Sequence, residues 1–155
     1  MSCSNPVILV HECKYKVDGI TKFIDNQGFE MDNTFSERES TETLYQCSIQ
    51  PQIDFLFDGG VVTCFAYGQT GSGKTFTMEG VEEHAVSDLY EGAKIMFEDV
   101  GRRFGFTVSY FEIYGGKLYD LLNNHAALAA QEDKSGSIIV SGIHEAQPQS
   151  AQEML

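Results

Sequence analysis

The sequence has few basic residues and no long hydrophobic run. Its 155 residues include 10 Lys and Arg against 23 Asp and Glu, which gives a formal net charge of −13. Nucleic-acid phosphates require a basic surface, so this balance argues against nucleic acid as a partner. No apolar run approaches the roughly 20 residues of a membrane-spanning helix, so we expect no membrane partner. With 42% hydrophobic residues, we expect one soluble domain or part of one.

The four cysteines and four histidines show no metal-binding spacing. No signal peptide is recognisable, so we expect the cysteines to be reduced thiols in the cytoplasm. The same scatter predicts neither a metal site on these residues nor a nucleophile–histidine pair. The residues concerned are Cys3, Cys13, Cys47, Cys64, His11, His84, His125 and His144.

The most informative segment is the glycine-rich run at 68–75, which fits the pattern G-x-x-x-x-G-K-[ST] without a mismatch. Glycines let the backbone fold into a tight loop whose N–H groups point at phosphates, and a following helix adds its positive dipole end. Lys74 would reach the β- and γ-phosphates, and the Thr75 hydroxyl would bind Mg²⁺. The predicted nucleotide-binding residues are therefore Gly68, Gln69, Thr70, Gly71, Ser72, Gly73, Lys74 and Thr75, with Thr75 as the magnesium ligand.

The flanks of this run favour a phosphate site over a flexible linker. Residues 61–67 are almost all apolar, β-branched or aromatic, which predicts a buried parallel strand that ends where the loop begins. Residues 76–78 can start a helix, which we expect Gly80 to stop. Strand, glycine loop and helix are the parts that a phosphate loop needs, in that order.

The remaining elements alternate between helix and strand. Ser40 to Phe57 reads as a helix capped by Ser40 and kinked at Pro51. Residues 86–100 form an amphipathic helix that Gly101 ends, and we expect its apolar stripe to pack against a sheet. Further strands are expected at 7–10 and 29–35, as a hairpin or sheet edge, and at 104–110 and 137–140, with a last helix starting at Ser150.

Two segments have sequences similar to the strand ends that bind magnesium in nucleotide-binding proteins, but their positions argue against that role. Residues 133–136 fit D-x-x-G, but they follow Ala-Ala-Gln-Glu and not an apolar strand, so a hairpin turn is favoured. Residues 55–58 place an aspartate after apolar residues, but they lie in the expected helix end.

Residues 66–78 resemble the phosphate loop of kinesin motor domains, in which Gln, Thr and Ser fill the variable positions and Thr-Met follows. Residues 108–114, followed by 117–122, are similar to the strand and short helix that come next in those motors. The resemblance implies a P-loop NTPase of α/β class, with a central β-sheet flanked by helices. It also implies ATP and Mg²⁺ as cofactors, tubulin and the microtubule as partners, and a place on the cytoplasmic cytoskeleton, including the spindle.

The N-terminal stretch 11–18, with 25–27 behind it, is similar to the internal-motor subfamily of kinesins that depolymerises microtubules. In that subfamily a Lys-Val-Asp tip on an extended hairpin contacts tubulin, which here implies Lys16, Val17 and Asp18. The same stretch is locally basic, because Lys14, Lys16 and Lys22 are offset only by Asp18.

The kinesin motifs that carry hydrolysis, Asn-x-x-Ser-Ser-Arg-Ser-His and Asp-Leu-Ala-Gly, do not occur in the 155 residues. We therefore expect residues 1–155 to be the phosphate-loop half of a motor domain, incomplete at both ends, with no catalytic residue in this half. The alternative is a catalytically silent nucleotide-binding module that acts through protein contact. A GTPase or small-molecule kinase is disfavoured, because no guanine-reading Asn-Lys-x-Asp is present.

Overall fold

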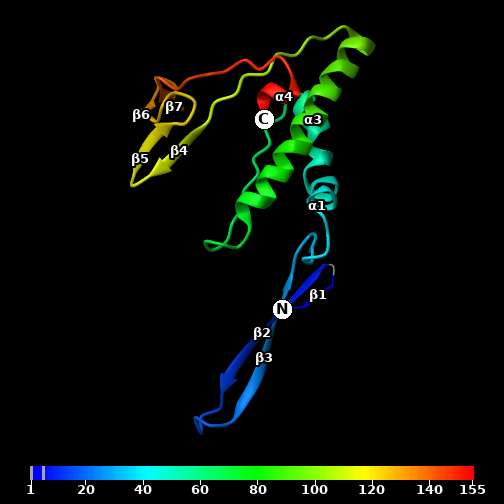
Figure 1. Ribbon diagram of the computed structural model, residues 1–155, viewed down its shortest axis with the longest axis vertical. Coiled ribbons are helices and arrows are strands. Elements are labelled where there is room, and N and C mark those ends of the chain that lie inside the picture. Colours follow the sequence, from blue (N-terminus) through cyan, green and yellow to red (C-terminus); the bar gives the residue numbers. More distant parts are fainter. Residues whose placement is uncertain (1, 5) are drawn as a thin grey trace. The chain divides into compact units, whose positions relative to one another are not determined.

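The computed structural model describes residues 2–4 and 6–155, which divide into two compact units. The first unit runs to Asp88 and the second from Leu89 onward, with one long helix passing from the first into the second (Figure 1). The elements are a mixture of helices and antiparallel sheets, consistent with part of an α/β domain.

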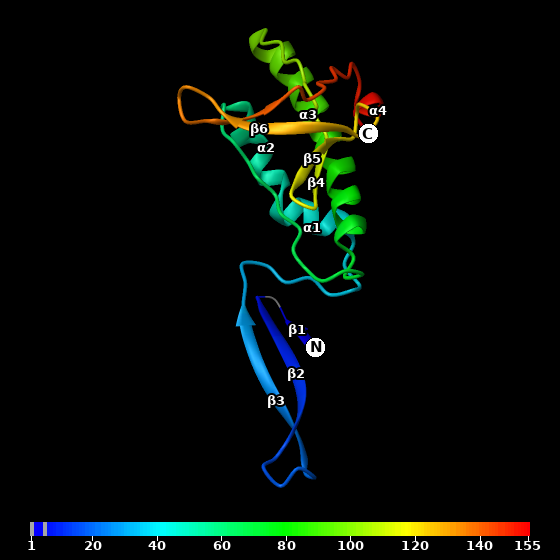
Figure 2. The ribbon, with the colours of Figure 1, turned by 90° about the vertical axis from the view of Figure 1, so that its left-hand side faces the viewer.

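The first unit begins with a long β-hairpin (Figure 2). Strand β2 (Val7–Tyr15) pairs antiparallel with β3 (Lys22–Glu30) from Val7 opposite Glu30 to Tyr15 opposite Lys22, and β1 (Ser2–Ser4) adds to the other edge of β2. The expected hairpin is confirmed, but the predicted strand at 29–35 is wrong beyond Glu30, because the strand that pairs with β2 runs from Lys22 to Glu30. Strand β2 is longer than the predicted 7–10. Residues 16–21 form its turn.

Helix α1 (Thr41–Ser48), the 3-10 turn η1 (Gln50–Gln52) and helix α2 (Ile53–Phe57) follow in sequence. The Ser40 side chain accepts a hydrogen bond from the Thr43 N–H at 3.2 Å, so the predicted cap is confirmed. The predicted single helix kinked at Pro51 is instead two helices, and Pro51, which has no N–H to donate, lies in the 3-10 turn η1 between them.

Helix α3 (Lys74–Val100) has 27 residues, so the predicted stop at Gly80 is wrong. A Cβ on Gly80 would lie 2.5 Å from Cγ2 of Thr41 in α1. Glycine costs about 1 kcal/mol in a helix interior, and here it allows two helices to approach closely. The predicted end is confirmed, because Gly101 follows the last helical residue with φ at +69°.

Helices α1, α2 and α3 form the apolar core of the first unit. In that unit α3 packs against α1, where the His84 ring stacks on Tyr45 at a centroid distance of 5.4 Å. Val86, the first residue of the 86–100 stripe, is buried in this unit, and the expected packing of the stripe against a sheet stays a prediction. The buried apolar side chains are Tyr45, Ile53, Phe57, Val81 and Val86.

The second unit carries an antiparallel meander in which β4 (Phe111–Tyr114), β5 (Lys117–Asp120), β6 (Ala126–Glu132) and β7 (Ile138–Ser141) pair in chain order. The expected short helix at 117–122 is wrong. Gly115 and Gly116 both have positive φ, at +57° and +75°, and such a pair closes a two-residue hairpin that returns the chain as strand β5.

The predictions for the C-terminal residues are confirmed. Strand β7 confirms the prediction at 137–140. Ser150 accepts a hydrogen bond from the Glu153 N–H at 3.2 Å and starts helix α4 (Ala151–Met154) as predicted. Residues 133–136 form the expected turn between β6 and β7, and 55–58 lie at the end of α2.

Two predicted strands do not form. Residues 61–67 have no regular structure, and Val61, Phe65 and Tyr67 are 86%, 85% and 102% exposed. Residues 104–110 contain only an isolated antiparallel pair between Val108 and Ala146. A central strand exists only when neighbouring strands accept its hydrogen bonds, and the described strands pair within their own local sheets.

Candidate functional site

The glycine-rich loop immediately precedes helix α3. Its turn is closed by a hydrogen bond of 3.2 Å from the Ser72 N–H to the Gln69 carbonyl. Gly71 and Gly73 have φ of +79° and +90°, a backbone region that other residues rarely adopt. A Cβ on Gly68 would lie 2.5 Å from Oγ of Ser72. The loop shape therefore favours glycine at the two fixed glycines of the pattern, Gly68 and Gly73, and also at Gly71, which occupies a variable position.

The Lys74 side chain folds back over the loop. Its ammonium nitrogen donates to the Gly68 carbonyl at 2.9 Å and to the Gln69 carbonyl at 2.8 Å. The positive charge is thus held against the loop backbone, where an anion that enters the loop would meet it. Sequence reasoning predicted this cation but not its two carbonyl acceptors.

The start of α3 supplies hydrogen-bond donors beside that cation. The first helical hydrogen bond runs from the Thr77 N–H to the Gly73 carbonyl at 3.0 Å. The N–H groups of Lys74 and Thr75 come before it, and no described residue accepts a backbone hydrogen bond from them. Free N–H groups and the positive dipole end favour an anion at this position. The residues therefore fit a phosphate group, and Thr75 is exposed with a hydroxyl that suits Mg²⁺.

The predicted tubulin-contacting residues lie at the turn of the β2–β3 hairpin. The turn is fixed by a hydrogen bond from the Lys16 N–H to the Thr21 carbonyl at 2.8 Å and one from the Gly19 N–H to the Lys16 carbonyl at 2.9 Å. Val17 is fully exposed, at 108%, and the Lys16 side chain is also exposed. The tip therefore presents an apolar and a basic side chain to the surroundings.

Asp18, in contrast, bonds within the turn. Its carboxylate accepts from the Thr21 hydroxyl at 2.6 Å and from the N–H groups of Thr21 at 2.8 Å and Ile20 at 2.9 Å. The Thr21 hydroxyl, and then these two N–H groups, hold the pKa of Asp18 below its usual range. Asp18 shapes the tip, whereas Lys16 and Val17 project from it.

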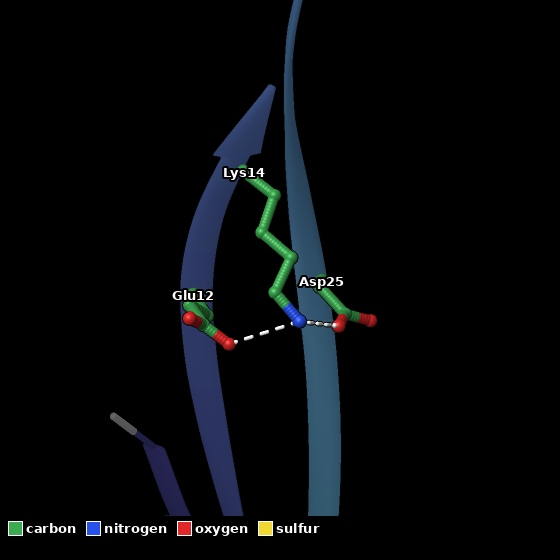
Figure 3. Close-up of polar contacts among 3 residues, drawn as sticks. All are labelled: Glu12, Lys14 and Asp25. Carbon is green, nitrogen blue, oxygen red and sulfur yellow. Dashed lines mark hydrogen bonds and ion pairs between the residues drawn. The ribbon is translucent and has the colours of Figure 1, made fainter. Parts of the chain in front are cut away.

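Lys14 was counted with the basic residues near the tip, but its ammonium group is held by two carboxylates of the hairpin (Figure 3). Glu12 and Asp25 stand directly opposite each other in the β2–β3 register, where two carboxylates repel. The Lys14 ammonium lies 2.6 Å from Oδ2 of Asp25 and 3.1 Å from Oε2 of Glu12, so it bridges the pair. The hydrogen bond with Asp25, then that with Glu12, raises the pKa of Lys14, and Lys14 lowers the pKa of Asp25.

The other lysine counted in the basic stretch is also engaged, since Lys22 lies 5.5 Å from the centre of the Tyr15 ring. Among the described side chains, no carboxylate forms an ion pair with Lys16. Of the three lysines in this stretch, Lys16 is therefore the one whose charge is left for a partner.

The residues that the structure describes form no metal centre besides these two places. In the described part of the chain, no group of three or more His, Cys, Asp and Glu residues could hold a metal ion. The thiols of Cys13, Cys47 and Cys64 are free and exposed, and Cys3 lies outside the residues whose side chains are described. None of the described helices has the length and apolar character needed to cross a bilayer.

Comparison with known proteins gives a consistent result. The family model described as the kinesin motor domain matches residues 3–155. "Diatom spindle kinesin-1" of Cylindrotheca fusiformis is 37% identical over 146 residues, which cover 94% of this chain and 23% of that protein. The chain therefore spans less than a quarter of the length of this curated relative.

Proposed function

Because the chain belongs to the kinesin motor-domain family, a family of microtubule motors with a P-loop NTPase fold, we propose that it is the ATP-binding part of such a motor. Kinesin motor domains bind ATP together with Mg²⁺. The observation that carries the proposal is the convergence of the Lys74 ammonium and the first N–H groups of α3 on one glycine-shaped loop.

Each group has a distinct role in the proposed site. Lys74 exchanges its contacts with the Gly68 and Gln69 carbonyls for phosphate oxygens, so the cation is in place before the nucleotide arrives. The N–H groups at the start of α3 bind the remaining oxygens. Thr75 holds Mg²⁺, which neutralises phosphate charge when bound.

The test of this site is calorimetric titration of the chain with MgATP. Lys74→Ala should weaken binding by about 2–3 kcal/mol, because a charge-assisted contact is lost. Lys134→Ala serves as the matched control, since it removes one exposed lysine from the turn between β6 and β7. Equal affinity of the parent chain and the Lys74 variant would mean that residues 68–75 are not the site.

We further propose that Lys16 and Val17 contact tubulin and that Asp18 gives the tip its shape. The full exposure of Val17 and the absence of an ion-pair partner for Lys16 among the described side chains support this role. Together with the subfamily resemblance of residues 11–18, they favour a microtubule depolymerase that couples ATP binding and hydrolysis to tubulin binding. The relative named a spindle kinesin favours microtubules of the spindle as the location.

A second candidate function is a nucleotide-binding module that acts only through protein contact. It is favoured by the state of residues 61–67, which form no strand to support the phosphate loop. Phosphate release from the purified chain tests the silent module, because only turnover can eliminate it. We expect MgATP binding without turnover above the Lys74→Ala background, and microtubule-stimulated release that depends on Lys74 would eliminate the silent module.

A further inference from the structure

The second unit contains a pocket of about 580 Å³ that none of the roles above uses. Three segments surround it, namely the last turns of α3, residues 103–107 and residues 147–149. Its volume lies within the range of small-molecule sites, about 300–1,000 Å³. Four aromatic rings are among its twelve lining residues, those of Tyr90, Phe97, Phe104 and Phe106.

The three segments are tied to one another. The Tyr90 hydroxyl donates to the Pro148 carbonyl at 2.9 Å, and the Tyr90 ring packs on Phe106 at a centroid distance of 4.7 Å. Just outside the pocket, Val108 and Ala146 exchange two backbone hydrogen bonds of 2.8 and 2.9 Å. These contacts hold the cavity in shape before any ligand arrives, which lowers the entropic cost of binding.

The two charged residues that line the pocket are basic, and one carboxylate lies beside it, that of Glu153, which accepts a hydrogen bond from the Gln149 N–H at 2.8 Å. Lys94 and Arg103 are among the lining residues, and no Asp or Glu is, although the chain carries 23 acidic residues. Within the described part of the chain neither cation forms an ion pair. The Arg103 guanidinium lies 5.3 Å from the centre of the Phe97 ring. A guanidinium that stacks on a ring keeps its edge N–H donors for an anion.

From this combination we propose that the pocket binds a small planar aromatic anion. The ring of the ligand packs among the aromatic walls, which recognise a flat apolar face. Its carboxylate, or a comparable anionic group, accepts hydrogen bonds from Arg103 and Lys94. An anionic ligand is favoured over a neutral or cationic one because it alone can form charge-assisted hydrogen bonds with both Lys94 and Arg103.

The matched probes 2-naphthoate and 2-naphthamide test the proposal, since they share a ring system and differ in charge. Calorimetric titration of the whole chain should show naphthoate binding about tenfold more tightly than the amide, as expected for a charge-assisted contact. Arg103→Gln and Lys94→Gln together should remove that advantage and leave amide binding unchanged. Both side chains are exposed, so the variants should keep the parent circular dichroism spectrum.

Two control variants locate the binding. Lys134→Gln removes an exposed lysine from the same unit and should change nothing. Lys74→Ala should also leave naphthoate binding intact, because Lys74 does not line the pocket. Weaker naphthoate binding in this variant would place the anion in the phosphate loop. Equal affinities of the two probes, unchanged binding in the Arg103 and Lys94 double variant, or no binding at millimolar naphthoate would each overturn the proposal.

Discussion

The hydroxyl of Tyr45 donates a hydrogen bond of 2.7 Å to Oδ2 of Asp88 and so joins helix α1 to helix α3. Tyr45 is only 2% exposed, and Gln50 donates to the same carboxylate oxygen at 3.0 Å. Burial, and then Asp88, raises the pKa of the Tyr45 hydroxyl. The group therefore stays protonated, and its stabilising contribution is lost only as the pH rises through that raised pKa, above the ordinary value of about 10.

Tyr45→Phe keeps the ring but leaves Asp88 with one donor fewer. We expect the free energy of unfolding to fall by about 1–2 kcal/mol, because a buried hydrogen bond to a charged group is removed. Urea unfolding followed by circular dichroism measures the loss. Tyr67→Phe is the matched control, because Tyr67 is fully exposed and should tolerate the change. Equal losses in both variants would contradict a stabilising role for the bond.

Lys14→Met should loosen the β2–β3 hairpin at neutral pH, because Glu12 and Asp25 would then face each other without a cation between them. Amide hydrogen exchange of β2 and β3 reports this as lost protection. Adding Glu12→Gln removes the repulsion and should restore protection. If the double variant exchanged as fast as Lys14→Met, the repulsion would not be the cause.

The same cluster predicts the pH range of hairpin stability. Because the fold lowers the pKa of Asp25, the ionised carboxylate stabilises the hairpin at pH values above its ordinary pKa of about 3.9. This stabilisation is lost as the pH falls through the folded-state pKa of Asp25. Because the fold raises the pKa of Lys14, the charged ammonium stabilises the hairpin at pH values below its ordinary pKa of about 10.4. This stabilisation is lost as the pH rises through the folded-state pKa of Lys14. Protection, corrected for intrinsic exchange, should therefore be constant between about pH 4 and 10.

At the tip, the proposed tubulin contact separates side chains that touch the partner from one that shapes the loop. Lys16→Ala and Val17→Ala should each reduce tubulin affinity in a sedimentation or thermophoresis assay. Asp18→Asn keeps a carbonyl oxygen that can accept from Ile20 and Thr21, so it should bind nearly as well as the parent. Asp18→Ala should bind less well, because the turn loses its acceptor.

A charge contact between Asp18 and tubulin would give a different pattern, in which Asn and Ala reduce affinity equally. For the depolymerase proposal, alanine at 16, 17 and 18 in the full-length protein should abolish microtubule-end disassembly in light scattering while sparing basal ATP hydrolysis. Unchanged disassembly would contradict the depolymerase subfamily and leave only the assignment to the kinesin family.

Gly80→Ala introduces a methyl group 2.5 Å from Cγ2 of Thr41, where it clashes with α1. Overpacking of this kind lowers the free energy of unfolding by about 1–3 kcal/mol, whereas the higher helix propensity of alanine raises it by about 1 kcal/mol. We therefore expect a net loss of stability in urea unfolding. Thr41→Ser removes Cγ2. Serine keeps a Cβ atom 3.0 Å from the added methyl group, so in that background Gly80→Ala should cost less stability but still some, and an undiminished loss would show that the clash with Cγ2 is not responsible.

Local sequence signals placed several features correctly, because their cause lies within a few residues. Ser40 caps α1 through an N–H three residues away, Pro51 breaks the helix through its own missing donor, and Gly101 ends α3 through its own φ. The glycine pattern at 68–75 located the loop and the start of α3 in the same way. Gly115 and Gly116 carried an equally local hairpin signal that we missed.

Only the tertiary structure decided the features that depend on distant partners. Residues 61–67 have the composition of a central strand, yet a strand forms only beside another, and no described strand pairs with them. Gly80 reads as a helix stop until Thr41 is seen beside it. Lys14 and Asp18 count as exposed charges in the sequence, but β-register and turn geometry turn one toward two carboxylates and the other toward backbone N–H groups. Sequence specifies the chemistry of each group, and the fold determines which groups are near enough to use it.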